Sequence, residues 1–115
     1  MSYLMKIPAN AIIAREKLTR YLLIRQRKSD KSKWLAQAGF TLNNPDELET
    51  AIRQLVAGAD AVYDGANRYG DFYRAEGTLV GVNGVNLESI TVWIIHSKVD
   101  TLFRFVTVKP KERKR

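Results

Sequence analysis

The stretch I-T-V-W-I-I, residues Ile90 to Ile95, decides the fold because five of its six side chains are apolar. A continuous apolar run of this length is typical of a central β-strand that is covered on both faces, or nearly so. The turn Gly81–Gly84 precedes it and contains Asn-Gly, which favours a hairpin because both residues accept positive φ. The segment therefore predicts an antiparallel sheet with this strand inside it.

Neighbouring segments supply the other expected strands. Phe72 to Val80 has strand character, and Gly77 within it indicates a bulge or a close approach of another element. Leu102 to Val108 predicts the last strand, which Pro110 ends, and Val62-Tyr63 is compatible with a further short strand. We therefore expect an antiparallel sheet of three to four strands.

The first half of the chain predicts about three helices. Arg15 to Leu23 places apolar residues at the i, i+3, i+4 spacing of an amphipathic helix. The second helix follows a cap at Ser29 or Asp30 and stops at Gly39. The third starts at Asn44-Pro45, where Pro suits the first turn, and ends at Gly58. Helices followed by antiparallel strands predict an α+β fold with the helices packed on one sheet face.

Length and composition indicate one globular domain. The chain has 115 residues, of which 45% are hydrophobic, and we expect a single domain over residues 1–108 and a disordered basic tail over 109–115. The absence of cysteine excludes a disulfide scaffold and thiolate zinc sites. No signal peptide or membrane span is readable, so a cytoplasmic protein without a membrane partner is expected.

Positive charge is concentrated in two stretches, and the net charge is +7. The tail is one of them, and a disordered, solvated terminus is the favoured interpretation there. The other leads into the second helix and holds five cations against Asp30: Arg25, Arg27, Lys28, Lys31 and Lys33. A solvated loop is the structural alternative, but such a concentration is also the electrostatic footprint expected for a polyanion such as RNA.

Several classes of enzyme site can be set aside. The chain has one histidine, so a two-histidine acid–base pair is impossible. No glycine-rich phosphate loop, nucleophile elbow or zinc spacing is present, so neither a metal nor a small-molecule cofactor is predicted. His96 lies at a strand-to-turn junction, and an exposed turn histidine is favoured over a catalytic base there.

Two cations are candidate phosphate ligands. Lys31 precedes Trp34 by about one helical turn, so its stem either covers apolar surface or its ammonium clamps a phosphate, and the two interpretations are equally weighted. Arg104 lies inside the last expected strand, which indicates that this sheet face is open. Its structural alternative is a salt bridge to Glu76 or Glu88, and its functional one is recognition of phosphate.

Aromatic and basic residues also alternate between residues 63 and 74. The residues concerned are Tyr63, Tyr69, Tyr73, Arg68 and Arg74. Stacking combined with charge is a common way to hold single-stranded RNA. Half-buried strand tyrosines would give the same pattern, and that interpretation is favoured.

Four segments, in order, resemble a known family. They are K-L-T-R-Y-L-L (Lys17 to Leu23), K-S-K-W-L-A-Q-A-G-F (Lys31 to Phe40), G-V-N-G (Gly81 to Gly84) with T-V-W-I-I (Thr91 to Ile95), and R-F-V-T (Arg104 to Thr107). They resemble an uncharacterised bacterial domain found as small stand-alone proteins and as the C-terminal tip of secreted polymorphic toxins. The resemblance covers nearly the whole chain except the tail.

That domain is similar to the barnase, EndoU and RelE group of metal-independent ribonucleases, in which helices precede a four-stranded antiparallel sheet. The resemblance implies that Lys31, Arg104 and Thr107 are catalytic, whereas Lys17 and Tyr21, which match the first motif, could equally be structural. The family histidine falls near Arg25 here and the following glycine near Lys28, which leaves two alternatives: a degenerate enzyme, or one that uses Lys, Arg and Tyr in place of the histidine. In a regular strand Arg104 and Thr107 face opposite sides, so they share one site only if a bulge intervenes or if Thr107 is structural.

Three functions remain as hypotheses. The first is a ribonuclease toxin that uses the RNA 2′-OH as nucleophile and is neutralised by an acidic antitoxin or immunity protein. The second is a non-catalytic RNA-binding module, and the third is a protein-interaction domain with a cationic face. The residues expected to contact RNA outside the catalytic set are Arg25, Arg27, Lys28, Lys33, Tyr69, Tyr73 and Arg74.

Overall fold

A computed structural model describes residues 5–28, 30–96 and 98–112. It is an α+β fold, as predicted, with five strands in the sheet rather than three or four. The strands are antiparallel and lie in chain order: β1 (Met5–Lys6), β2 (Asp60–Asn67), β3 (Gly70–Val80), β4 (Asn86–Ile95) and β5 (Phe103–Pro110). The additional strand is β1, which precedes the helices. Its two residues are too short a segment to show an alternating pattern.

Of the three expected helices, two are α-helices, α1 (Ser32–Ala36) and α2 (Pro45–Ala57). The first helical segment, η1 (Lys17–Leu22), is a π-helix, and the Leu23 amide donates to the Leu18 carbonyl five residues back. The N-cap residue of α1 is Lys31, and the expected cap Asp30 lies one residue before it, where its carboxylate accepts a hydrogen bond from the Ser32 amide at 3.1 Å. Ser29, the other expected cap, lies outside the described residues.

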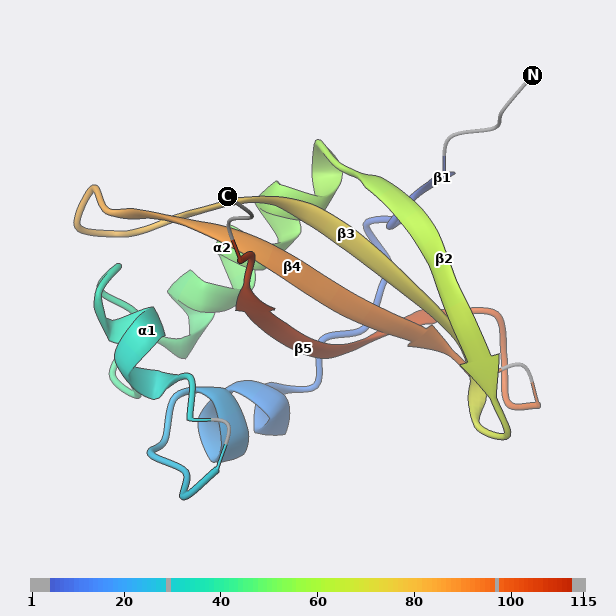
Figure 1. Cartoon of the computed structure of the whole chain (residues 1–115), viewed down its shortest axis with the longest axis horizontal. Coiled ribbons are helices and arrows are strands. Elements are labelled where there is room, and N and C mark those ends of the chain that lie inside the picture. The colour runs from blue at the N-terminus through green and yellow to red at the C-terminus, as the bar shows by residue number, and fades with distance from the viewer. Residues whose placement is uncertain (1–4, 29, 97, 113–115) are drawn as a thin grey trace.

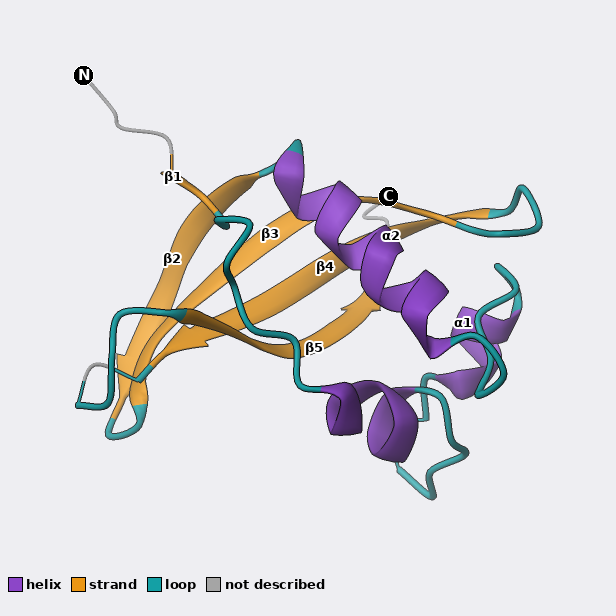
Figure 2. Cartoon of the chain, turned by 180° about the vertical axis from the view of Figure 1, so that it is seen from behind, coloured by secondary structure: helices purple, strands orange, loops and turns teal. Residues whose placement is uncertain are grey.

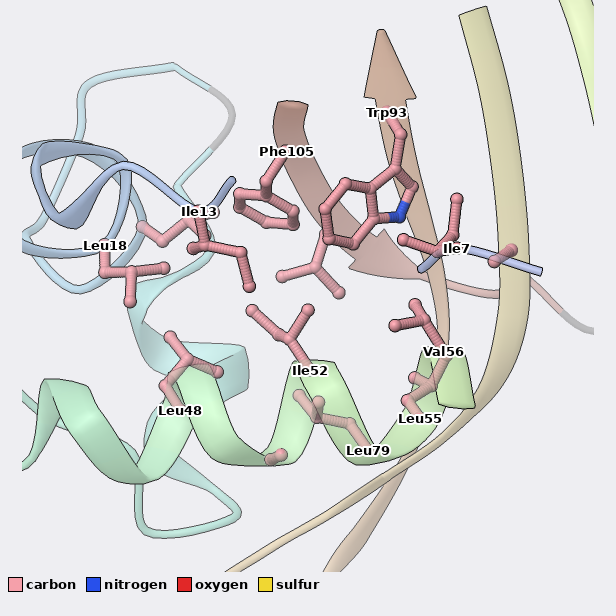
Figure 3. Packing of buried hydrophobic residues seen from close by; sticks show 14 of the residues in the cluster. Ile7, Ile13, Leu18, Leu48, Ile52, Leu55, Val56, Leu79, Trp93 and Phe105 are labelled. Carbon is pink, nitrogen blue, oxygen red and sulfur yellow. The ribbon is translucent and has the colours of Figure 1, made fainter. Parts of the chain in front are cut away.

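The helix α2 covers one face of the sheet (Figure 2), and strands β2 to β4 have no described helix in front of their other face (Figure 1). The core lies between α2 and the sheet, where Trp93 from the central apolar strand packs among side chains that include Ile52 and Val56 (Figure 3). A Cβ at Gly77 would lie 3.2 Å from Leu55 of α2. Gly77 therefore marks a close approach, and its pairing with Ser89 is regular.

The strand β4 is central, because it pairs with β3 on one side and β5 on the other. Thr91 and Trp93 are buried on the α2 side, whereas Ile90 and Val92, on the other face, are half-buried. Ile94, also on that other face, is buried, so the prediction of a strand covered on both faces, or nearly so, is met fully on the α2 face and in part on the opposite one. We call the face opposite α2 the open face.

The sheet extends beyond the boundary expected at residue 108. Lys109 and Pro110 belong to β5, and the Lys111 amide donates to the Glu88 carbonyl at 2.9 Å. Lys111 also forms an ion pair with Glu76 at 3.0 Å. These contacts tie the first part of the expected tail to β4 and β3, while residues 113–115 lie outside the described part. The division into a domain and a tail stays a prediction.

Candidate functional site

The geometry of β5 decides whether the predicted residues can meet. Thr107 pairs with Val92 and Arg104 pairs with Ile94, with a register shift that leaves Val106 as an extra residue. Paired residues share a sheet face, and Val92 and Ile94 are two positions apart on one strand, so Arg104 and Thr107 both lie on the open face. Two residues along a strand span about 7 Å. The bulge that a shared site requires is therefore present.

Lys31 is brought to this face by its place directly before α1. Its Nζ donates a hydrogen bond to Oγ1 of Thr107 at 2.9 Å, although the two residues are 76 positions apart. Burial, and secondarily the neighbouring charge of Lys109, hold the pKa of Lys31 below its usual 10.5. No carboxylate pairs with Lys31 in the described ranges. The arrangement is a half-buried cation with a hydroxyl partner and no counter-charge.

Arg104 has a carboxylate partner, but a different one from those expected. Its guanidinium donates to Asp100, in the turn before β5, and not to Glu76 or Glu88. Glu76 is instead held by Arg74 and Lys111, and Glu88 accepts a hydrogen bond from Thr78. The Leu102 amide, and then Arg104, hold the pKa of Asp100 below its usual value. The Arg104 side chain is 32% exposed, so it retains donors that can reach a ligand.

Arg104 also lines a hollow of about 420 Å³ that includes residues of the open face. The hollow exists because the segment around Ile12 runs parallel to β5, with Ile12 bridged to Arg104, and this brings Lys17 of η1 alongside. Apolar side chains supply much of its surface and four polar residues line it. The lining includes Ile12, Phe72, Ile94, Val106, Lys17, Tyr69, His96 and Arg104. Apolar walls with a few polar groups are typical of small-molecule sites.

His96 has a defined orientation in this hollow. Its Nδ1 lies 3.1 Å from the Tyr69 carbonyl oxygen. A carbonyl can only accept, so Nδ1 carries the hydrogen and Nε2 of the neutral ring keeps its lone pair. Gly70 makes this approach possible, because a Cβ there would lie 2.0 Å from the Ile95 carbonyl oxygen. His96 is half-buried rather than an exposed turn residue.

Sequence reasoning therefore missed His96 and left Lys17 undecided. The available signal for His96 was its position directly after the central apolar strand, but nothing in the sequence shows that the turn Asn67–Gly70 meets it. Lys17 stood in a recognised motif, and its role depends on how the N-terminal segment runs along β5.

The predicted RNA-contacting residues fall into separate places. Arg25, Arg27, Lys28 and Lys33 are exposed around the loop before α1. Tyr69 lies at the β2–β3 turn, where the Arg68 guanidinium lies 5.0 Å from its ring centroid. Tyr73 pairs with Trp93 and packs edge-on against Phe103, so it belongs to the α2 face.

Arg74 lies on the open face but is paired with Asp64 at 2.9 Å and Glu76 at 3.2 Å. The structure thus does not bring Tyr69, Tyr73 and Arg74 together, because neighbouring strand residues alternate between faces. No group of three or more His, Asp or Glu side chains that could hold a metal ion occurs within the described ranges. None of the described helices is long and apolar enough to cross a membrane.

Comparison with known proteins gives two matches. A family model described as "Domain of unknown function (DUF6883)" matches residues 5–112. A chain of a solved structure, a contact-dependent growth inhibition toxin–immunity protein complex from Klebsiella pneumoniae 342, has a TM-score of 0.64 and is 18% identical in sequence. The match covers 91% of this chain and 97% of that one, which shows a shared fold. No curated protein matches.

Proposed function

The chain belongs to the DUF6883 family of unknown function, and we propose that it is a small ribonuclease toxin that cleaves RNA without a metal ion. One observation carries the proposal: the Lys31–Thr107 pair lies beside Arg104 on the open face of the sheet. Two cations on one accessible face, one of them without a counter-charge among the described residues, suit a phosphodiester.

The reaction needs few groups from the protein because RNA brings its own nucleophile. The 2′-oxygen attacks the adjacent phosphorus, the bond from phosphorus to the 5′-oxygen breaks, and the products carry a 2′,3′-cyclic phosphate and a 5′-hydroxyl. Lys31 and Arg104 stabilise the negative charge of the pentacoordinate phosphorane. The Thr107 hydroxyl lies 3.4 Å from the Val108 carbonyl, a long hydrogen bond, so its hydrogen can turn towards a phosphate oxygen.

Two proton transfers complete the proposed mechanism. His96 Nε2 accepts the proton of the 2′-OH, since its Nδ1 hydrogen is committed to the Tyr69 carbonyl. Lys31 gives a proton to the departing 5′-oxygen, and a pKa below 10.5 makes it a better acid than an ordinary lysine. Asp100 orients the Arg104 guanidinium and leaves its remaining donors for phosphate.

A toxin with this activity needs a partner that blocks it, and we propose an acidic antitoxin or immunity protein that covers the open face. The exposed cations around residues 25–33 would attract such a partner. The similar solved structure comes from a complex of a toxin with an immunity protein, a title that names both components. The basic charge of this chain favours the toxin component, which would act on RNA in the cytoplasm.

The test uses purified full-length protein and cellular RNA in the presence of EDTA. We expect cleavage by the wild type, with a loss of about 100-fold or more in Lys31→Ala and in Arg104→Ala. Lys6→Ala is the control. Lys6 lies in β1, at the opposite edge of the sheet from β5, and forms an ion pair with Asp60 of β2. A substrate with 2′-deoxy sugars should resist cleavage.

Intact RNA after prolonged incubation with folded wild-type protein would remove the enzyme proposal. Unchanged cleavage in both site variants would show that the site lies elsewhere. RNA binding without cleavage would support the second candidate, a non-catalytic RNA-binding module. The Asp100 carboxylate favours this candidate, because it accepts one of the hydrogen bonds that Arg104 could give to a phosphate.

A further inference from the structure

We propose that the hollow beside Arg104 binds the nucleobase of the nucleotide on the 5′ side of the cleaved bond. This inference rests on the proposed function and adds the part of the substrate that is recognised. The hollow is separate from the Lys31–Thr107 pair, which does not line it, and Arg104 is common to both.

The surface of the hollow suits a flat aromatic ring. Phe72 and Ile94 are cross-strand partners on the open face, and together they form an apolar floor. Tyr69 lines the hollow from the hairpin turn and is 57% exposed, so its ring can stack with a base. A volume of about 420 Å³ leaves room for a base and its ribose.

The polar groups around the hollow indicate on which side of the cleaved bond the bound nucleotide lies. Arg104 lines the hollow and lies on the same face as Thr107, so a phosphate between Arg104 and Lys31 is directly adjacent to the hollow. His96 lines the same hollow, with Nε2 available to accept a proton. The nucleotide whose 2′-OH meets His96 is the one that carries the nucleophile, and that nucleotide lies 5′ to the bond that breaks.

Binding can be measured without any cleavage. Nuclear magnetic resonance titrations of the full chain with the four nucleoside 3′-monophosphates should give saturable shifts at Tyr69, Phe72 and His96. We expect at least one of them to bind five or more times tighter than inorganic phosphate, and tighter than its own 5′-monophosphate. Tyr69→Ala should weaken this binding at least fivefold, because it removes a stacking surface while leaving the backbone carbonyl that holds His96.

Tyr21→Ala is the matched control, since Tyr21 is 61% exposed on η1 and does not line the hollow. Nucleotides that bind no tighter than inorganic phosphate, or equal effects of the two tyrosine variants, would overturn the proposed base site. Tighter binding of 5′-monophosphates would overturn the assigned side.

The two proposals fail in different ways. RNA cleavage without base binding would remove the base site and leave the ribonuclease. Base binding in a protein that cleaves no RNA would overturn the link to a cleaved bond, and the hollow would then be a nucleotide site of another kind.

Discussion

Lys31 carries a charge in surroundings that favour its neutral form. Its pKa is lowered by burial first and by Lys109 second, and its hydrogen-bond partner Thr107 is neutral. A cation held in this way destabilises the native state whenever it is protonated. A bound phosphate would relieve that destabilisation, which is why a perturbed group in an open position is a candidate for function.

Replacing Lys31 by an apolar residue should therefore lower the proposed activity and raise the free energy of unfolding. We expect Lys31→Met to have a free energy of unfolding at pH 7 higher than that of the wild type by on the order of 0.5 kcal/mol, and therefore to unfold at a higher denaturant concentration. Between the folded pKa of Lys31 and 10.5 the unfolded chain binds more protons than the native protein, so this penalty in the wild type fades as pH rises. The advantage of the variant should shrink across the same window.

Urea unfolding followed at several pH values from 7 to above 10 measures the difference. Lys33→Met is the control, because Lys33 is an exposed lysine two residues further along the chain, in α1. An advantage that stays constant with pH, or a less stable Lys31→Met, would contradict the argument from burial.

The residues of the candidate site were predictable to different degrees. Lys31, Arg104 and Thr107 stood in recognisable motifs, and the hydrogen bond between Lys31 and Thr107 brings two of them together. His96 was interpreted as an exposed turn residue and Lys17 was left undecided, because the hollow joins segments far apart in sequence. Nothing local to either residue reveals that the two lie on one cavity.

At the scale of elements, the turn between β2 and β3 packs against the end of β4 and is hydrogen-bonded to His96, the residue that follows it. Gly70 has φ of 154° and stands against the Ile95 carbonyl, and the preceding Tyr69 carbonyl accepts the His96 hydrogen. A side chain at residue 70 would force the turn away from β4. The orientation of His96, directly after β4, therefore depends on the glycine that begins β3.

We expect Gly70→Ala to lower the free energy of unfolding by about 2 kcal/mol or more and to disturb the His96 ring environment. Gly84→Ala is the comparison, since Gly84 also has positive φ, 87°, but open space where a Cβ would lie. That variant should lose only the backbone strain, about 1 kcal/mol. Thermal unfolding and the His96 resonances test both, and equal losses would contradict the role of the clash.

The sequence predicted element types better than their details. The apolar run at residues 90–95 and the Asn-Gly turn located β4 and its hairpin, and Gly77 marked the approach of α2. A shared site requires the bulge at Val106, but the presence of that bulge depends on the partner strand. The π-helical form of η1 and the short β1 have no comparable signal in the sequence.

At the scale of the whole molecule, the cations of the described residues divide into exposed side chains and side chains that are paired with carboxylates. Arg25, Arg27 and Lys28 are exposed in one loop and form no ion pair with any described carboxylate, whereas Arg74 is neutralised by two carboxylates. Formal charge alone does not distinguish these cases. Only the cations without a partner are available to displace counterions from a nucleic acid.

Binding of a 2′-deoxy oligonucleotide, which resists cleavage, should therefore depend steeply on salt. Replacing Arg25, Arg27 and Lys28 together by Gln should reduce the slope of log affinity against log salt by about 2, if each contacts one phosphate of a single strand. Arg74→Gln should leave the slope unchanged. Fluorescence anisotropy from 50 to 300 mM salt, roughly the useful range, measures both. An unchanged slope in the triple variant would exclude this loop from the binding surface.

The parallel bridge between Ile12 and Arg104 has a practical consequence for how the protein can be shortened. The backbone of Ile12 satisfies the Phe103 carbonyl and the Phe105 amide, each at 2.8 Å. Trimming the chain to begin at the first helix would leave those groups unpaired along an outer strand. Strand edges with unpaired groups readily bind a second chain, so we expect the truncated protein to aggregate. A solubility tag fused ahead of residue 5 would keep the hydrogen bonds between Ile12 and β5 intact.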